Sequence, residues 1–106
     1  MAERRRLQNR RASSNFNFEC GPHCFVATVS YFPGTNNLAE IFLGNGRAGS
    51  DVDSAAKDSA VVCSIALQHG VPLDVVRHAL LRDAHGVASS PLGVALDIIA
   101  GDGGER

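Results

Sequence analysis

The stretch from Leu38 to Gly70, LAEIFLGNGRAGSDVDSAAKDSAVVCSIALQHG, contains the features that decide the fold of this chain. It begins with an apolar strand pattern, LAEIFLGN, continues through a glycine-rich turn, GRAGS, and ends in the longest helical pattern of the sequence. Ser50 and Asp53 form an S-x-x-D capping box, which predicts a helix that begins at Asp51 and ends before Gly70. We expect the rest of the chain to cover the apolar surface of this strand and helix.

The helical pattern has two faces. Small and aliphatic residues recur at steps of three and four, and we expect these to face the core: Val52, Ala55, Ala56, Ser59, Ala60, Val62, Cys63, Ala66 and Leu67. Polar residues fall between them and are expected in solvent: Asp53, Lys57, Ser64 and Gln68. Because many of the expected core residues are small, the helix should pack closely on its neighbours.

Length and composition indicate a single domain. The chain has 106 residues, of which 44% are hydrophobic and 20% charged. It contains no run of eighteen apolar residues, and no apolar segment follows the N-terminal arginines, so we expect a cytoplasmic protein without a secretory signal. Three cysteines are too few for a disulfide-stapled secreted domain, which favours reduced thiols.

Charge is divided unevenly along the chain. Residues 1–14 contain one glutamate and five arginines, which gives this segment a charge of +4; the arginines are Arg4, Arg5, Arg6, Arg10 and Arg11. Because the whole chain carries −1, the remainder carries −5. We expect residues 1–14 to be a flexible basic arm, residues 15–101 the domain and residues 102–106 a disordered end. The arm can bind nucleic acid or an acidic partner, or it can simply lie in solvent or on its own acidic body.

Two alternating segments before the central stretch predict a β-hairpin. With Pro22 and His23 as the central turn residues, Cys20 pairs with Phe25, and the aromatic side chains gather on one face. The same register directs Cys24 to the face opposite Cys20, which disfavours a disulfide between them.

A turn-rich segment, residues 33–37, then leads into the strand that starts at Leu38 and completes an antiparallel meander. In that strand Ile41 and Leu43 should face the core, with Glu40 and Phe42 on the other side.

Two more helices are expected after the central one. Pro72 is suited to be the first residue of a helix that ends near Asp83, and this helix should turn Leu73, Val76, Ala79 and Leu80 inward and Arg77 and Arg82 outward. Residues 83–89 read as a loop, and Ser90-Pro91 begins a third helix that stops at Gly101. The predicted fold class is therefore α+β, a three-stranded antiparallel β-meander followed by three helices packed on one face.

Cys20, His23 and Cys24 have the residue types of half a zinc site. A closed structural site needs four ligands, usually from two such pairs, and the sequence has no second pair. We therefore expect these residues to pack at the hairpin end, and we predict neither a metal nor another cofactor. The sequence also lacks a nucleophile signature, so we do not expect catalysis by this chain alone.

The turn GNGRAGS has some features of a phosphate-binding loop. Glycines leave backbone amides exposed just before a helix N-terminus, and an arginine is nearby, so a nucleotide could bind there. The candidate binding residues are Glu40, Gly46, Arg47, Gly49 and Ser50. The motif is neither a Walker sequence nor a dinucleotide fingerprint, and the alternative is a strand-to-helix turn that needs glycine for its geometry alone.

The order of these segments resembles a known family, the TSCPD domain. Its most specific pieces here are Glu40-Ile41-Phe42, the turn Arg47-Ala48-Gly49-Ser50 and the segment ALQHGVP at 66–72. In the turn, the family commonly has lysine in place of the arginine. The resemblance extends from Arg4 to Ile99. TSCPD domains occur at the C-terminus of adenosylcobalamin-dependent ribonucleotide reductases and as small separate proteins.

The resemblance implies a free-standing, non-catalytic module that regulates or assists ribonucleoside-diphosphate reductase in deoxyribonucleotide and hence DNA synthesis. Its expected partner is a ribonucleotide reductase or another protein of nucleotide metabolism, and a homo-oligomer is compatible with it. The T-S-C-P-D motif that names the domain is absent from this sequence, so the resemblance carries no metal site with it. Nucleic-acid binding by the arginine arm is the alternative function.

Overall fold

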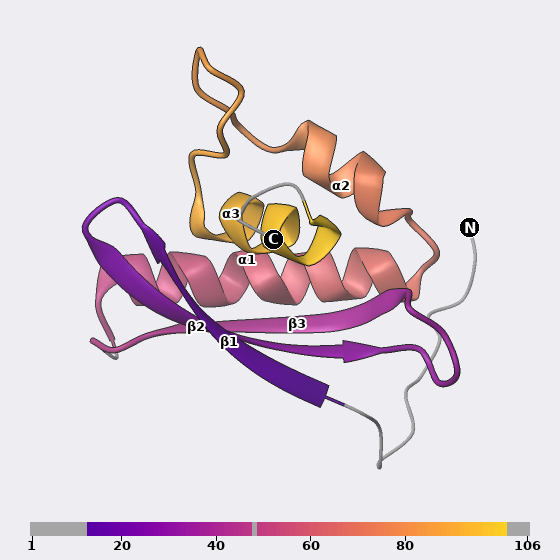
Figure 1. The fold of residues 1–106 in the computed structure, drawn as a ribbon. Helices are drawn as coiled ribbons and strands as arrows, with labels where there is room; N and C mark the ends of the chain where they lie inside the picture. The colour runs from indigo at the N-terminus through magenta and orange to yellow at the C-terminus, as the bar shows by residue number, and fades with distance from the viewer. Residues whose placement is uncertain (1–12, 48, 102–106) are drawn as a thin grey trace.

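The computed structural model describes residues 13–47 and 49–101, which form a three-stranded antiparallel sheet followed by three helices (Figure 1). In chain order the elements are β1 (Ser13–Cys20), β2 (His23–Tyr31), β3 (Leu38–Asn45), α1 (Asp51–Gln68), α2 (Leu73–Ala79) and α3 (Pro91–Ala100). The α+β class and the order of the elements are confirmed. The five arginines of the predicted arm and the predicted disordered end lie outside the described residues.

The helices lie on one face of the sheet. Helix α1 packs along β3, α3 contacts both α1 and β1, and α2 packs against α3 further from the sheet (Figure 1). The core between them is formed by apolar side chains of every layer, which include Phe25, Val29, Ile41, Ala60, Cys63 and Leu96. As predicted, Ile41 and Leu43 face this core while Phe42 lies on the exposed side of the sheet.

The hairpin between β1 and β2 closes one step earlier than predicted. Cys20 pairs with His23, not with Phe25, and the central turn residues are Gly21 and Pro22. Gly21 has a φ of 60°, which is the conformation that a two-residue hairpin turn requires at its first central position. The predicted register was wrong by two residues, an even number, so every side chain stays on its predicted face.

Helix α1 begins and ends as predicted. The Ser50 side chain accepts a hydrogen bond from the Asp53 amide at 3.1 Å, and Gly70, with a φ of 93°, follows the last turn. The prediction that Asp53, Ser64 and Gln68 face solvent was wrong, because all three are buried against β3. Val62, predicted to face the core, is 67% exposed.

The buried polar residues of α1 cap the outer edge of β3. Ser64 Oγ accepts from the Ile41 amide at 2.9 Å and donates to the Ile41 carbonyl at 3.0 Å. Gln68 Nε2 donates to the Ala39 carbonyl at 3.0 Å, and Asp53 Oδ1 accepts from the Asn45 amide at 2.9 Å. An edge strand buried under a helix needs such partners, since its outward amides and carbonyls have no neighbouring strand.

The second helix is shorter than predicted. It ends at Ala79 rather than near Asp83, and Pro72 is its N-cap rather than its first residue. Arg77, predicted to point outward, is buried, whereas Ala79 is exposed. The expected loop at 83–89 is in part a small hairpin, because Arg82 and Ala88 form an antiparallel bridge.

The third helix follows the prediction. Ser90 Oγ accepts from the Gly93 amide at 3.2 Å, Pro91 is the first helical residue, and Gly101 has a φ of 88° at the end. Among the described residues, no helix is both long and apolar enough to cross a membrane.

Candidate functional site

The glycine turn joins β3 to α1, and the structure shows what its backbone amides bind. Asp53, in the first turn of α1, points back toward this turn. Its Oδ1 accepts from the Asn45 amide at 2.9 Å and its Oδ2 accepts from the Gly49 amide at 3.3 Å. The Arg47 amide donates to the Asn45 side chain at 2.9 Å, and the Ser50 amide donates to the Arg47 carbonyl at 3.2 Å. These amides of the turn therefore already have partners within the chain.

The Asp53 carboxylate is held in its ionised form. The hydrogen bond from the Asn45 amide is the main cause that lowers the pKa of Asp53, and the bond from Lys57 adds to it. Lys57 Nζ lies 3.0 Å from Asp53 Oδ2, one turn further along α1. A buried carboxylate that accepts two backbone amides takes the position that a bound anion would take at a helix N-terminus. A phosphate at this turn would have to displace Asp53.

Of the remaining candidate residues, Gly46 and Arg47 lie in the turn and Glu40 lies on β3. Arg47 is exposed in the turn, while Glu40 lies on the outer face of the sheet, opposite Ser30 of β2. Glu40 and Asn45 are five positions apart along β3, which is about 17 Å at the usual rise of a β-strand. The structure thus brings Gly49 and Ser50 together at the helix start and leaves Glu40 at the other end of the strand.

A second candidate is the cavity at the end of the β1–β2 hairpin. It has a volume of about 590 Å³ and lies between the hairpin turn, the first half of α1 and the segment that leads into α3. Its lining is mostly apolar and small, with Phe25, Ala55 and Leu92 among the residues, and it includes Cys20 and His23. Burial raises the pKa of the Cys20 thiol, so this thiol stays protonated at neutral pH.

The three residues of the apparent zinc half-site do not converge. Cys24 pairs with Glu19 and is exposed, on the face opposite Cys20, as the hairpin prediction required. In the part of the chain that the structure describes, no three side chains of metal-ligating type are grouped so that they could hold an ion. The third cysteine, Cys63, is buried in α1, and burial raises its pKa to about 11.

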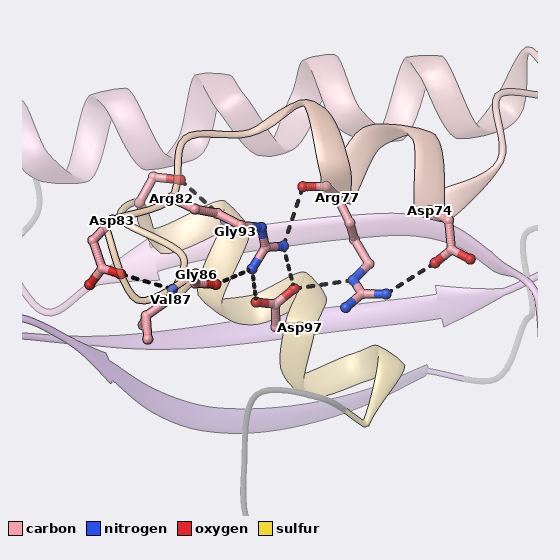
Figure 2. Close-up of polar contacts among 9 residues, drawn as sticks. Asp74, Arg77, Arg82, Asp83, Gly86, Val87, Gly93 and Asp97 are labelled. Carbon is pink, nitrogen blue, oxygen red and sulfur yellow. Dashed lines mark hydrogen bonds and ion pairs between the residues drawn. The ribbon is translucent and has the colours of Figure 1, made fainter.

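A charged cluster between α2, α3 and the hairpin at 82–88 was not foreseen from the sequence (Figure 2). Asp97 of α3 is 7% exposed and lies between two arginines. Arg77 Nε donates to Asp97 Oδ1 at 3.1 Å, and Arg82 donates to both carboxylate oxygens, at 2.7 and 2.9 Å. Arg77 also donates to Asp74 at 3.0 Å.

The geometry of this cluster is that of a structural clamp. The guanidinium of Arg82 also donates to the carbonyls of Arg77 and Gly86, so it joins the end of α2 to the small hairpin. The hydrogen bond from Arg82 is the main cause that lowers the pKa of Asp97. The sequence contains one signal for this charged cluster, which is the aspartate within the apolar run VALDII. A charge at such a position needs a partner if the helix is buried.

The outer face of the sheet carries the apolar side chains that the helices do not cover. Val26 of β2 is 45% exposed and Phe42 of β3 is 47% exposed. Phe42 pairs with Thr28, next to Val26 along β2 on the same face, and Glu40 lies two residues before Phe42. The outer face therefore presents an aromatic ring beside a carboxylate.

Comparisons with known proteins give no relative. No family model matches the chain, and neither a curated protein nor a solved structure matches it.

Proposed function

We propose that this chain is a non-catalytic, cytoplasmic interaction module of the TSCPD type that assists or regulates a ribonucleotide reductase, or another protein of deoxyribonucleotide synthesis. The proposal starts from the resemblance in the sequence. Its support is that the residues which carry the resemblance have defined places in the fold. Gly49 has a φ of 83°, Ser50 caps α1, Gln68 binds the edge of β3, and Gly70 ends the helix.

The observation that carries the interaction role is the outer face of β3. Glu40 and Phe42 belong to one of the three segments that carry the resemblance, yet Phe42 contributes nothing to the core and is half exposed. An aromatic ring at an exposed sheet position, next to a charge, is typical of residues that anchor protein interfaces. We propose that the partner docks on Glu40, Phe42 and Val26, with Arg47 at the end of the surface.

The test is a pull-down from native extract with the wild-type chain and a Phe42→Glu variant. We expect the wild type to recover a ribonucleotide reductase or another enzyme of nucleotide metabolism, and the variant to lose it at least tenfold, because a charge at the centre of an interface is costly. Val62→Glu is the matched control, since Val62 is also exposed but lies on α1. Recovery of unrelated proteins alone, or equal loss in both variants, would count against the proposal.

A second candidate function is nucleic-acid binding. Its support is the charge division of the sequence, with five arginines between Arg4 and Arg11 and an excess of acid in the rest. The arm has no aromatic residue that could stack on bases, so we propose weak binding to the phosphate backbone without sequence preference.

A further inference from the structure

The two edges of the sheet differ in how their backbone groups are paired. The edge of β3 lies under α1, where Asp53, Ser64 and Gln68 supply four hydrogen bonds to its amides and carbonyls. The other edge is β1, eight residues long, which is bonded to β2 on one side only. An edge of this length without cover is a template for another strand.

Hairpin geometry shows which groups of β1 point outward. Cys20 and His23 close a two-residue turn, so they form a hydrogen-bonded pair, and such pairs alternate along an antiparallel ladder. The amides and carbonyls of Ser13, Asn15, Asn17 and Glu19 therefore point away from β2. Within the described residues these groups have no hydrogen-bond partner, in contrast to those of Ala39, Ile41 and Asn45 on β3.

We propose that the β1 edge pairs with β1 of a second copy of this chain, in antiparallel orientation, to form a continuous six-stranded sheet. The outward groups require odd-numbered residues to lie opposite odd-numbered residues, and among these registers we propose the one centred on Phe16, which lies in the middle of β1. Asn15 of one copy then pairs with Asn17 of the second copy, and Phe16 lies opposite Phe16 of the second copy. This arrangement is two-fold symmetric, as most homodimers are.

The side chains of β1 fit this register. Phe16, Phe18 and Phe25 form an aromatic row on the core face, with ring centroids 5.9 and 5.5 Å apart. Phe18 and Phe25 are buried, but Phe16, at the start of the row, is only partly buried. Across the two-fold axis, the two Phe16 rings would face each other at a non-hydrogen-bonded position, where opposing side chains are closest.

Charge favours a second copy as the occupant. In the same register Ser13 lies opposite Glu19 of the second copy, and Arg10 and Arg11 come shortly before Ser13 in the sequence. The twelve residues that precede β1 in the sequence carry +4 and the rest of the chain −5, so a second copy offers each N-terminal segment a body of opposite net charge.

The experiment measures the mass of the full chain in solution by light scattering, with charge-swapped variants. One variant carries Asn15→Asp and Asn17→Asp, and the other carries Asn15→Lys and Asn17→Lys. Both positions are exposed, so neither change disturbs the core. We expect the wild type to have the mass of two 11.2 kDa chains, each variant alone to have the mass of one, and an equimolar mixture of the two to return to two.

The control is Phe42→Glu, which alters the outer face but not the β1 edge and should remain a dimer. A wild type with the mass of one chain overturns the proposal. So does a pair of variants that keep the dimer, since that result would place the contact elsewhere on the molecule. The outcome does not depend on the reductase proposal, because no other protein is present.

Discussion

Asp53 illustrates how one side chain acquires a role that its neighbours in sequence do not reveal. The sequence predicts it as part of a capping box, and Ser50 does accept from its amide. Its carboxylate, however, accepts hydrogen bonds from the amides of Asn45 and Gly49, which come before the helix, rather than from those of the first helical turn. The glycine turn therefore owes its shape to an internal anion.

Asp97 is a second buried carboxylate with partners from other parts of the chain. It forms ion pairs with both Arg77 and Arg82, which come from α2 and from the hairpin that follows it. Removal of one partner from a buried ion pair typically costs about 3 kcal/mol or more, because the other charge stays buried.

The lowered pKa values of Asp53 and Asp97 predict acid sensitivity. Because each carboxyl binds its proton less readily in the folded state than in the unfolded state, the stability it adds is complete above the unfolded pKa of about 4 and is lost as pH falls through the folded pKa. Urea unfolding between pH 6 and pH 2.5, an assay range set around that value, should show stability that is level at first and falls below about pH 4.

Replacing each of these two aspartates by asparagine tests whether they cause the loss of stability in acid. Asp53→Asn and Asp97→Asn should each make the acid decline shallower, although both variants are less stable at neutral pH. Asp58→Asn, at an exposed position of α1, is the control and should leave the decline unchanged. If the free energy of unfolding of both test variants fell with pH as steeply as that of the wild type, these carboxylates would not be the cause of the acid sensitivity.

At the scale of the element, α1 combines two functions. Its small residues, Ala56, Ala60 and Cys63, let it pack closely on the sheet, and the polar residues beside them bind the edge of β3. The hydrophobic pattern could predict the first function. It could not predict the second, because a period of 3.6 residues assigns polar residues to solvent and carries no information about a neighbouring strand edge.

The packing of α1 gives a prediction about its faces. Ala60→Asp places a charge at a position with 0% exposure and should lower the free energy of unfolding by about 3 kcal/mol or more, which for many domains of this size abolishes folding. Cys63→Asp should do the same. Chemical denaturation followed by circular dichroism measures both.

Val62→Asp is the matched control, one turn or less away on the same helix and 67% exposed. It should change the stability by no more than about 0.5 kcal/mol. Similar melting of the Ala60 and Val62 variants would contradict the orientation of α1.

At the scale of the whole molecule, charge separates the two proposed functions. An arm of +4 attached to a body of −5 gives the body no attraction of its own for nucleic acid. Binding to DNA would therefore depend on the arm, while binding to a protein partner through Phe42 would not.

The nucleic-acid proposal predicts a steep salt dependence. If the arginines neutralise four or five phosphates of duplex DNA, the logarithm of the binding constant should fall with the logarithm of salt concentration with a slope of roughly −4. Fluorescence anisotropy at several salt concentrations measures this slope. Deletion of residues 1–12, which leaves β1 intact, should abolish binding, and binding that persists after the deletion would rule out the arm as the contact.

The sequence by itself determined the parts of this protein that depend on local chemistry. Alternation, turn residues, the Ser50 and Ser90 caps and the glycines that end helices act within a few residues, so the six elements and their order could be predicted. The tertiary structure alone decided the hairpin register, the burial of Ser64, Gln68 and Arg77, and the pairing of Asp97. The buried polar side chains depend on partners that are 15 to 29 residues away, as in the bonds of Arg82 to Asp97 and of Gln68 to Ala39, because a polar side chain is buried only where such a partner satisfies it. The hairpin register depends instead on the conformation of the two-residue turn at Gly21 and Pro22, which alternation along the strands does not specify.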